Sequence, residues 1–77
     1  MNAREMFEEL GYERSADIDV IAYSKKLDDT FFHRFEIMFD LLEKDIVLDD
    51  GYEAYIINYA LLKAINKQCK ELGWIQW

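Results

Sequence analysis

The chain has 77 residues, of which 52% are hydrophobic and 16% aromatic, and it carries a formal net charge of −7. This composition excludes an intrinsically disordered chain, since there is enough apolar surface for the core of a single small domain. The lone cysteine excludes an internal disulfide, and no apolar run approaches the roughly 20 residues that span a bilayer. Together with a polar, acidic start, these features predict a cytoplasmic protein without a membrane association.

The acidic charge is concentrated in the first part of the chain. Residues 1–50 hold fourteen acidic and six basic side chains, whereas residues 51–77 hold two acidic and three basic ones. An acidic surface repels nucleic acid and attracts basic partners, so we expect no direct contact with nucleic acid. The simpler alternative is that the acids only keep a small domain soluble.

The first predicted element is a helix over residues 2–10. Asn2 can cap its start, and Glu5 three residues later completes a capping box. Gly11 followed by Tyr12 is a typical helix end, because glycine adopts the left-handed conformation there without a steric cost. The predicted apolar stripe consists of Ala3, Met6, Phe7 and Leu10.

The middle of the chain alternates between apolar and polar residues, as strands do. The alternation predicts strands over residues 17–25, 31–41 and 45–49. Gly51 marks a hairpin turn after Asp50, so residues 52–57 form either a fourth strand or a bulged continuation of the third. Short connections between consecutive strands predict an antiparallel meander.

A second helix is predicted over residues 58–72, capped by Asn58 and ended by Gly73 and Trp74. Its buried face is expected to carry Leu61, Leu62, Ile65, Cys69 and Leu72. The predicted fold class is therefore α+β. It has an N-terminal helix, a three- to four-stranded antiparallel meander sheet and a C-terminal helix, with both helices on one sheet face.

With both helices on one face, the other sheet face is open to water. The long strand is expected to turn Phe35, Ile37 and Phe39 toward the core. The open face then displays Ile21, Tyr23, Phe32, Met38 and Val47, set among Asp19, Arg34, Glu36 and Asp40. Exposed apolar patches rimmed by charge mark interaction sites. The alternatives are an outer face of no special role, or one that residues 52–57 cover.

The residues predicted to bind a partner combine this face with the terminal tryptophan. An exposed tryptophan at the chain end is costly without a partner or a groove. The predicted set is Asp17, Asp19, Tyr23, Phe32, Glu36, Met38, Asp40 and Trp77.

No motif for catalysis or cofactor binding stands out. The glycines occupy turn and cap positions instead of a phosphate loop, and the serines have no histidine or acid at a recognisable spacing. We therefore expect neither an enzyme nor a cofactor. The only metal candidates are His33 and Cys69, with Asp28 and Asp29 as possible further ligands. The alternative is a hydrogen-bonded histidine and an inert buried thiol.

Two segments carry a resemblance to known proteins. The opening AREMFEELGY of residues 3–12 and the ending LKAINKQCKELGWI of residues 62–75 resemble small proteins encoded by phages and prophages of Gram-positive bacteria. The resemblance implies a phage product acting in a bacterial cytoplasm and brings no catalytic residue with it. Small acidic phage proteins in that setting include inhibitors of host defence, anti-CRISPR proteins among them.

These observations leave three functions to compare. The first is a non-enzymatic inhibitor that binds a host protein with a basic surface, such as a nucleic-acid-binding defence effector. The second is a structural homodimer formed through the open sheet face, with no host target. The third is a small metal-binding protein that uses His33 and Cys69.

Overall fold

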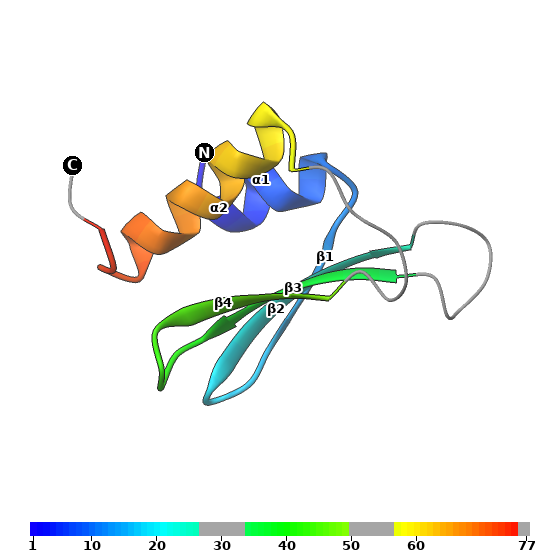
Figure 1. The fold of residues 1–77 in the computed structure, drawn as a ribbon. Helices are drawn as coiled ribbons and strands as arrows, with labels where there is room; N and C mark the ends of the chain where they lie inside the picture. Colours follow the sequence, from blue (N-terminus) through cyan, green and yellow to red (C-terminus); the bar gives the residue numbers. More distant parts are fainter. Residues whose placement is uncertain (27–33, 50–56, 76–77) are drawn as a thin grey trace.

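The structure is a computed structural model of the chain, and it describes residues 1–26, 34–49 and 57–75. In these residues a helix, four antiparallel strands and a second helix follow one another, in the predicted α+β order (Figure 1). The elements are α1 (Ala3–Glu9), β1 (Glu13–Ala16), β2 (Val20–Lys26), β3 (Arg34–Asp40), β4 (Asp45–Asp49) and α2 (Tyr59–Glu71).

The local signals that predicted α1 are all present. The Glu5 N–H donates to the Asn2 side chain at 2.8 Å, and the Asn2 N–H donates to the Glu5 carboxylate at 3.0 Å. At the other end Gly11 has a φ of +92°, and the Tyr12 N–H donates to the Phe7 carbonyl at 3.0 Å. The Tyr12 ring then packs edge-on against Phe7, with ring centroids 5.7 Å apart. This Schellman end turns the chain from the helix toward the sheet.

The second helix begins and ends in the same way. The Leu61 N–H donates to the Asn58 side chain at 2.9 Å. Gly73 has a φ of +76°, and the Trp74 N–H donates to the Cys69 carbonyl at 2.9 Å. The repeated Glu-Leu-Gly-aromatic sequence is therefore a shared helix ending, as the capping rules predict.

The four strands form a meander in the order β1-β2-β3-β4. The strand β1 was not predicted, and the predicted start of β2 at Asp17 is wrong, because residues 17–19 form the turn between these two strands. Ile18, which was assigned to the strand, is 86% exposed in that turn. The alternative strand over residues 52–57 lies almost entirely outside the described residues, and Ile57 is not in a strand.

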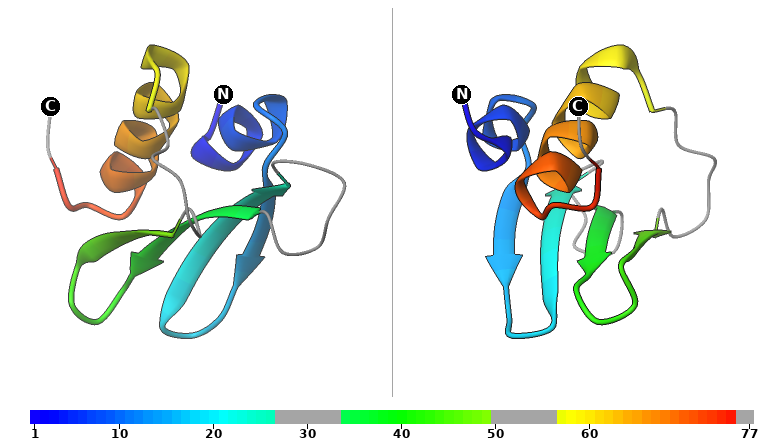
Figure 2. Two further views of the ribbon diagram at one scale, coloured as in Figure 1. Left: turned by 45° about the vertical axis from the view of Figure 1, so that its right-hand side comes forward. Right: turned by 90° about the vertical axis from the view of Figure 1, so that its left-hand side faces the viewer.

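Both helices lie on the same side of the sheet, as predicted (Figures 1 and 2). They run antiparallel, because the start of α1 lies beside the end of α2. There the Ala3 N–H donates to the Glu71 carboxylate at 2.7 Å. A carboxylate from one helix thus satisfies a free N–H at the positive end of the other.

The core between the layers is largely aromatic. Phe7 of α1 stacks on Tyr23 of β2 with ring centroids 3.8 Å apart, and Phe39 meets both rings edge-on. The predicted inward positions on β3, namely Phe35, Ile37 and Phe39, are all buried. Aromatic pairs of this kind contribute about 0.5–1.5 kcal/mol each beyond the area that they bury.

One face assignment was wrong. Tyr23 pairs with Ile37 and Ile21 pairs with Phe39, so both β2 side chains point toward the helices instead of the open face. Tyr23 is fully buried and Ile21 nearly so. Directly paired residues share a sheet face, and the register with β3 therefore decides which side of β2 is covered. The open face of β2 carries Val20 and Ala22.

Candidate interaction surface

The sheet face opposite the helices has an apolar centre that crosses three strands. Ala22 of β2 is paired with Met38 of β3, which is paired in turn with Val47 of β4. A shallow hollow of about 310 Å³ lies at one side of this row, and its lining includes Asp17 and Val20. The open face thus has an apolar row across three strands, with a shallow hollow beside it.

Acidic side chains gather where the sheet ends at its two turns. The β1–β2 and β3–β4 turns lie at the same end of the sheet (Figure 1), and the Leu41 N–H donates to the Asp19 carbonyl at 2.9 Å between them. We call this region the acidic end, and it comprises Asp17, Asp19, Asp40, Glu43 and Asp45.

Backbone groups hold two of these carboxylates in place. The Ile18 N–H donates to the Asp17 carboxylate at 2.7 Å, and the N–H groups of Leu42 and Glu43 donate to that of Asp40 at 3.0 Å each. In the described parts of the chain, no carboxylate of the acidic end forms a salt bridge. The acidic end therefore keeps its negative potential toward solvent.

Acids also face each other directly across β3 and β4. Asp40 is paired with Asp45, and Glu36 is paired with Asp49. Like charges in opposite positions destabilise a sheet by roughly 0.2–1 kcal/mol per pair. The Asp40–Asp45 pair is such a local conflict, and conflicts of this kind often occur at functional sites, which makes this face a candidate interaction surface.

Most residues predicted to bind a partner lie at this surface. Asp17, Glu36 and Met38 line the same hollow, Asp40 follows on the open face of β3, and Asp19 lies in the adjacent turn. Tyr23 was predicted wrongly, because it is buried beneath the helices. Phe32 and Trp77 lie outside the described residues.

Of the four metal candidates, the structure describes only Cys69. His33, Asp28 and Asp29 lie outside the described residues, whereas Cys69 lies in the core on α2. Burial raises the pKa of the Cys69 thiol, which favours the protonated form over the thiolate that binds metals. Among the residues that the structure describes, no three His, Cys, Asp or Glu side chains are grouped to hold a metal ion.

The high exposure of strand β4 was not predicted. All five of its residues are exposed, and Ile46, Val47 and Leu48 retain 36%, 47% and 46% of their accessible surface. Three consecutive apolar residues between Asp45 and Asp49 were visible in the sequence. The exposure of these three side chains could not be predicted from the sequence, because it depends on how far the helix layer extends over the sheet.

No family model matches this chain. Comparisons with curated proteins and with solved structures also give no match. Among the described residues, no helix has the length and apolar character needed to cross a membrane. The function must therefore be argued from the surface itself.

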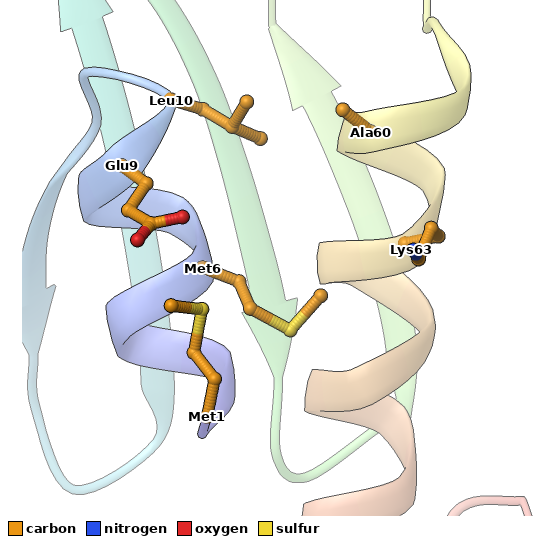
Figure 3. Close-up of a pocket in the computed structure, with 6 residues that line it drawn as sticks. All are labelled: Met1, Met6, Glu9, Leu10, Ala60 and Lys63. Carbon is orange, nitrogen blue, oxygen red and sulfur yellow. The ribbon is translucent and has the colours of Figure 1, made fainter.

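A second hollow lies between the helices, on the side away from the sheet. It encloses about 210 Å³, and Met6 and Leu10 point from α1 toward α2 across it (Figure 3). Ala60 and Lys63 line its α2 side, and Glu9 lies at its rim. Its lining is mainly apolar and lacks converging polar groups, which a specific small-molecule site needs.

A buried hydrogen bond links β2 to α2 within the core. The Tyr23 hydroxyl donates to the Gln68 side-chain oxygen at 2.6 Å, and both residues are buried. Burial raises the pKa of Tyr23, and a hydrogen bond from Arg14 partly offsets this shift. Gln68 was not predicted to be buried, although its spacing of four residues from Ala64 and seven from Leu61 places it on the buried stripe.

Proposed function

We propose that this chain is a non-enzymatic binding protein that docks a basic partner protein on the open face of its sheet. The observation that carries the proposal is the acidic end beside an apolar centre on one sheet face. Apolar area supplies most of the affinity of a protein interface, whereas complementary charge supplies rate and specificity.

The resemblance of the chain ends to phage proteins supports a more specific form of this proposal. An array of carboxylates can compete with phosphates for a channel that normally accepts nucleic acid. The partner is then a host protein with such a channel, and the chain acts in the bacterial cytoplasm as an inhibitor of a defence effector, in the manner of an anti-CRISPR protein.

The central side chains of this surface can bind a partner through shape and charge, but they are not suited to catalysis. Its central residues are Val20, Ala22, Met38 and Val47, none of which acts as a nucleophile, acid or base. The open-face hydroxyl of Ser24 accepts a hydrogen bond from Arg34 at 2.8 Å. A binding role therefore accounts for this face better than a catalytic one.

A charge-matched comparison tests the proposal. The surface variant carries Asp19→Asn, Glu36→Gln and Asp40→Asn, and the control carries Glu5→Gln, Glu8→Gln and Glu9→Gln on α1. Asparagine at position 40 keeps the oxygen that holds the turn, and glutamine at position 5 keeps the capping box. Both variants change the net charge equally.

Each immobilised protein is exposed to a lysate of a Gram-positive bacterium at rising salt. We expect the wild type and the control to retain a common basic protein at low salt. The surface variant should retain about tenfold less, since exposed charges contribute about 0–1 kcal/mol each and tenfold corresponds to about 1.4 kcal/mol. Equal retention by both variants, or release that is insensitive to salt, contradicts the proposal.

A further inference from the structure

Strand β4 forms one margin of the sheet. In the strand order it is the last strand, and among the described residues only β3 pairs with it. Alternate backbone N–H and C=O groups of such a strand point away from the sheet, where another strand can bind them. Ile46 and Leu48 on the helix side and Val47 on the open face are all exposed. The middle of this margin is therefore apolar on both faces.

The opposite margin, β1, differs from β4. It consists of Glu13, Arg14, Ser15 and Ala16, which are charged or small, and it is only four residues long. Short, charged margins are how natural sheets avoid pairing with other chains. Only β4 therefore offers the apolar contacts that strand addition needs.

The charges on β4 determine which strand fits it. Asp45 and Asp49 lie on the open face at the two ends of β4, beside Asp40 and Glu36 of β3. A second copy paired antiparallel about Val47 would place each Asp45 next to the other copy's Asp49. Such a pairing lines up four acids in each row, and like charges in opposite positions are unfavourable. A second copy is thus a poor occupant.

We propose that β4 accepts an extended segment of the basic partner as a fifth strand, and that this segment has three apolar or β-branched residues between two basic ones. The two basic side chains would then lie on the open face beside Asp45 and Asp49, next to Asp40 and Glu36 of β3. Because Asp45 and Asp49 lie two residues on either side of Val47, the pattern fits a strand that adds parallel or antiparallel to β4. This inference rests on the proposed function and specifies how the partner is held.

A synthetic peptide tests the inference on the intact chain. The probe has the core Lys-Val-Thr-Val-Lys between Gly-Ser flanks, and amide NMR of the protein reports binding. We expect shifts at residues 45–49 and not at β1. A peptide with glutamate for both lysines should bind at least about tenfold more weakly. Of two peptides that are N-methylated at complementary alternate core positions, the one whose methyl groups block the N–H groups facing β4 should weaken by a similar factor, and the other should bind like the unmodified peptide.

Protein variants provide the reciprocal test. Asp45→Lys with Asp49→Lys should reverse the preference toward the glutamate peptide, whereas the matched change Glu13→Lys on β1 should leave it unaltered. The inference is overturned if the lysine peptide does not shift β4, if it binds no better than the glutamate peptide, or if neither N-methylated peptide binds more weakly than the unmodified one.

Two further outcomes separate this inference from the proposed function. If Asp45→Asn with Asp49→Asn makes the protein dimerise in sedimentation while the wild type ignores the lysine peptide, the acids only prevent self-pairing and the inference fails. If the lysine peptide fails to bind while the surface variant still retains less of a basic protein than the wild type does, the proposed function stands and strand addition is overturned.

Discussion

Two buried groups that can ionise lie on either side of the same core. The Tyr23 hydroxyl meets Gln68 at 2.6 Å, and the Cys69 thiol follows Gln68 on α2. Neither side chain is exposed enough for water to solvate its anion, so burial raises the pKa of Tyr23 above 10.0 and that of Cys69 above 9.0. Their neutral forms are therefore preferred in the folded state.

These shifts predict alkaline unfolding. Because the folded pKa values are raised, the stability that they contribute is complete below pH 9.0 and is lost as the pH rises through the folded values. Each group lowers the free energy of unfolding by about 1.4 kcal/mol per pH unit in its window. Urea denaturation between pH 8 and pH 11 measures the decline. Cys69→Ala should reduce the decline in unfolding free energy at the lower pH values, and Tyr23→Phe should reduce it at the higher ones. If the decline has the same slope in both variants as in the wild type, these two groups are not its cause.

At the scale of the element, both helices end at a glycine whose backbone adopts the left-handed conformation that a Schellman end requires. Gly11 and Gly73 have φ values of +92° and +76°, and each is followed by an aromatic residue whose N–H bonds back to the last turn. A Cβ at Gly73 meets nothing within 4 Å, whereas one at Gly11 would lie 3.4 Å from the Lys25 side chain. The two sites share a backbone cost and differ only in their surroundings.

Alanine substitution at the two glycines should therefore give similar losses. Gly73→Ala is expected to cost about 1–2 kcal/mol, which is the cost of a left-handed non-glycine residue, and Gly11→Ala at least as much. Thermal and urea unfolding measure both. Gly73→Asn is the control, because asparagine tolerates this conformation and should lose less. A neutral Gly73→Ala would show that the helix end relaxes without this cap.

At the scale of the whole molecule, the net charge of −7 is not spread evenly. Acids of neighbouring strands oppose each other on the open face, whereas on α1 Glu8 lies 3.9 Å from Arg4 in an exposed pair. Removing one negative charge therefore has a different effect at the two places, although the net charge changes equally.

This contrast predicts opposite signs for two matched variants. Asp45→Asn should raise the free energy of unfolding by about 0.2–1 kcal/mol because it relieves the pair with Asp40. Glu8→Gln should leave it unchanged or lower it by about 0.3–0.5 kcal/mol, since it removes a helix ion pair. Denaturation at low and high salt measures both. An equal gain in both variants would assign the effect to net charge instead of the strand register.

The sequence by itself determined the helices, their caps and the antiparallel meander of the later strands, because capping boxes, Schellman ends and short turns depend on residues close together in the chain. The tertiary structure decided the rest. Residues 20–23 are apolar in both phases of a strand, so only pairing of Tyr23 with Ile37 shows which side is buried. The polar β1 becomes a strand because β2 supplies its hydrogen-bond partners. The exposure of β4 follows from the extent of the helix layer, and contacts between distant segments set that extent.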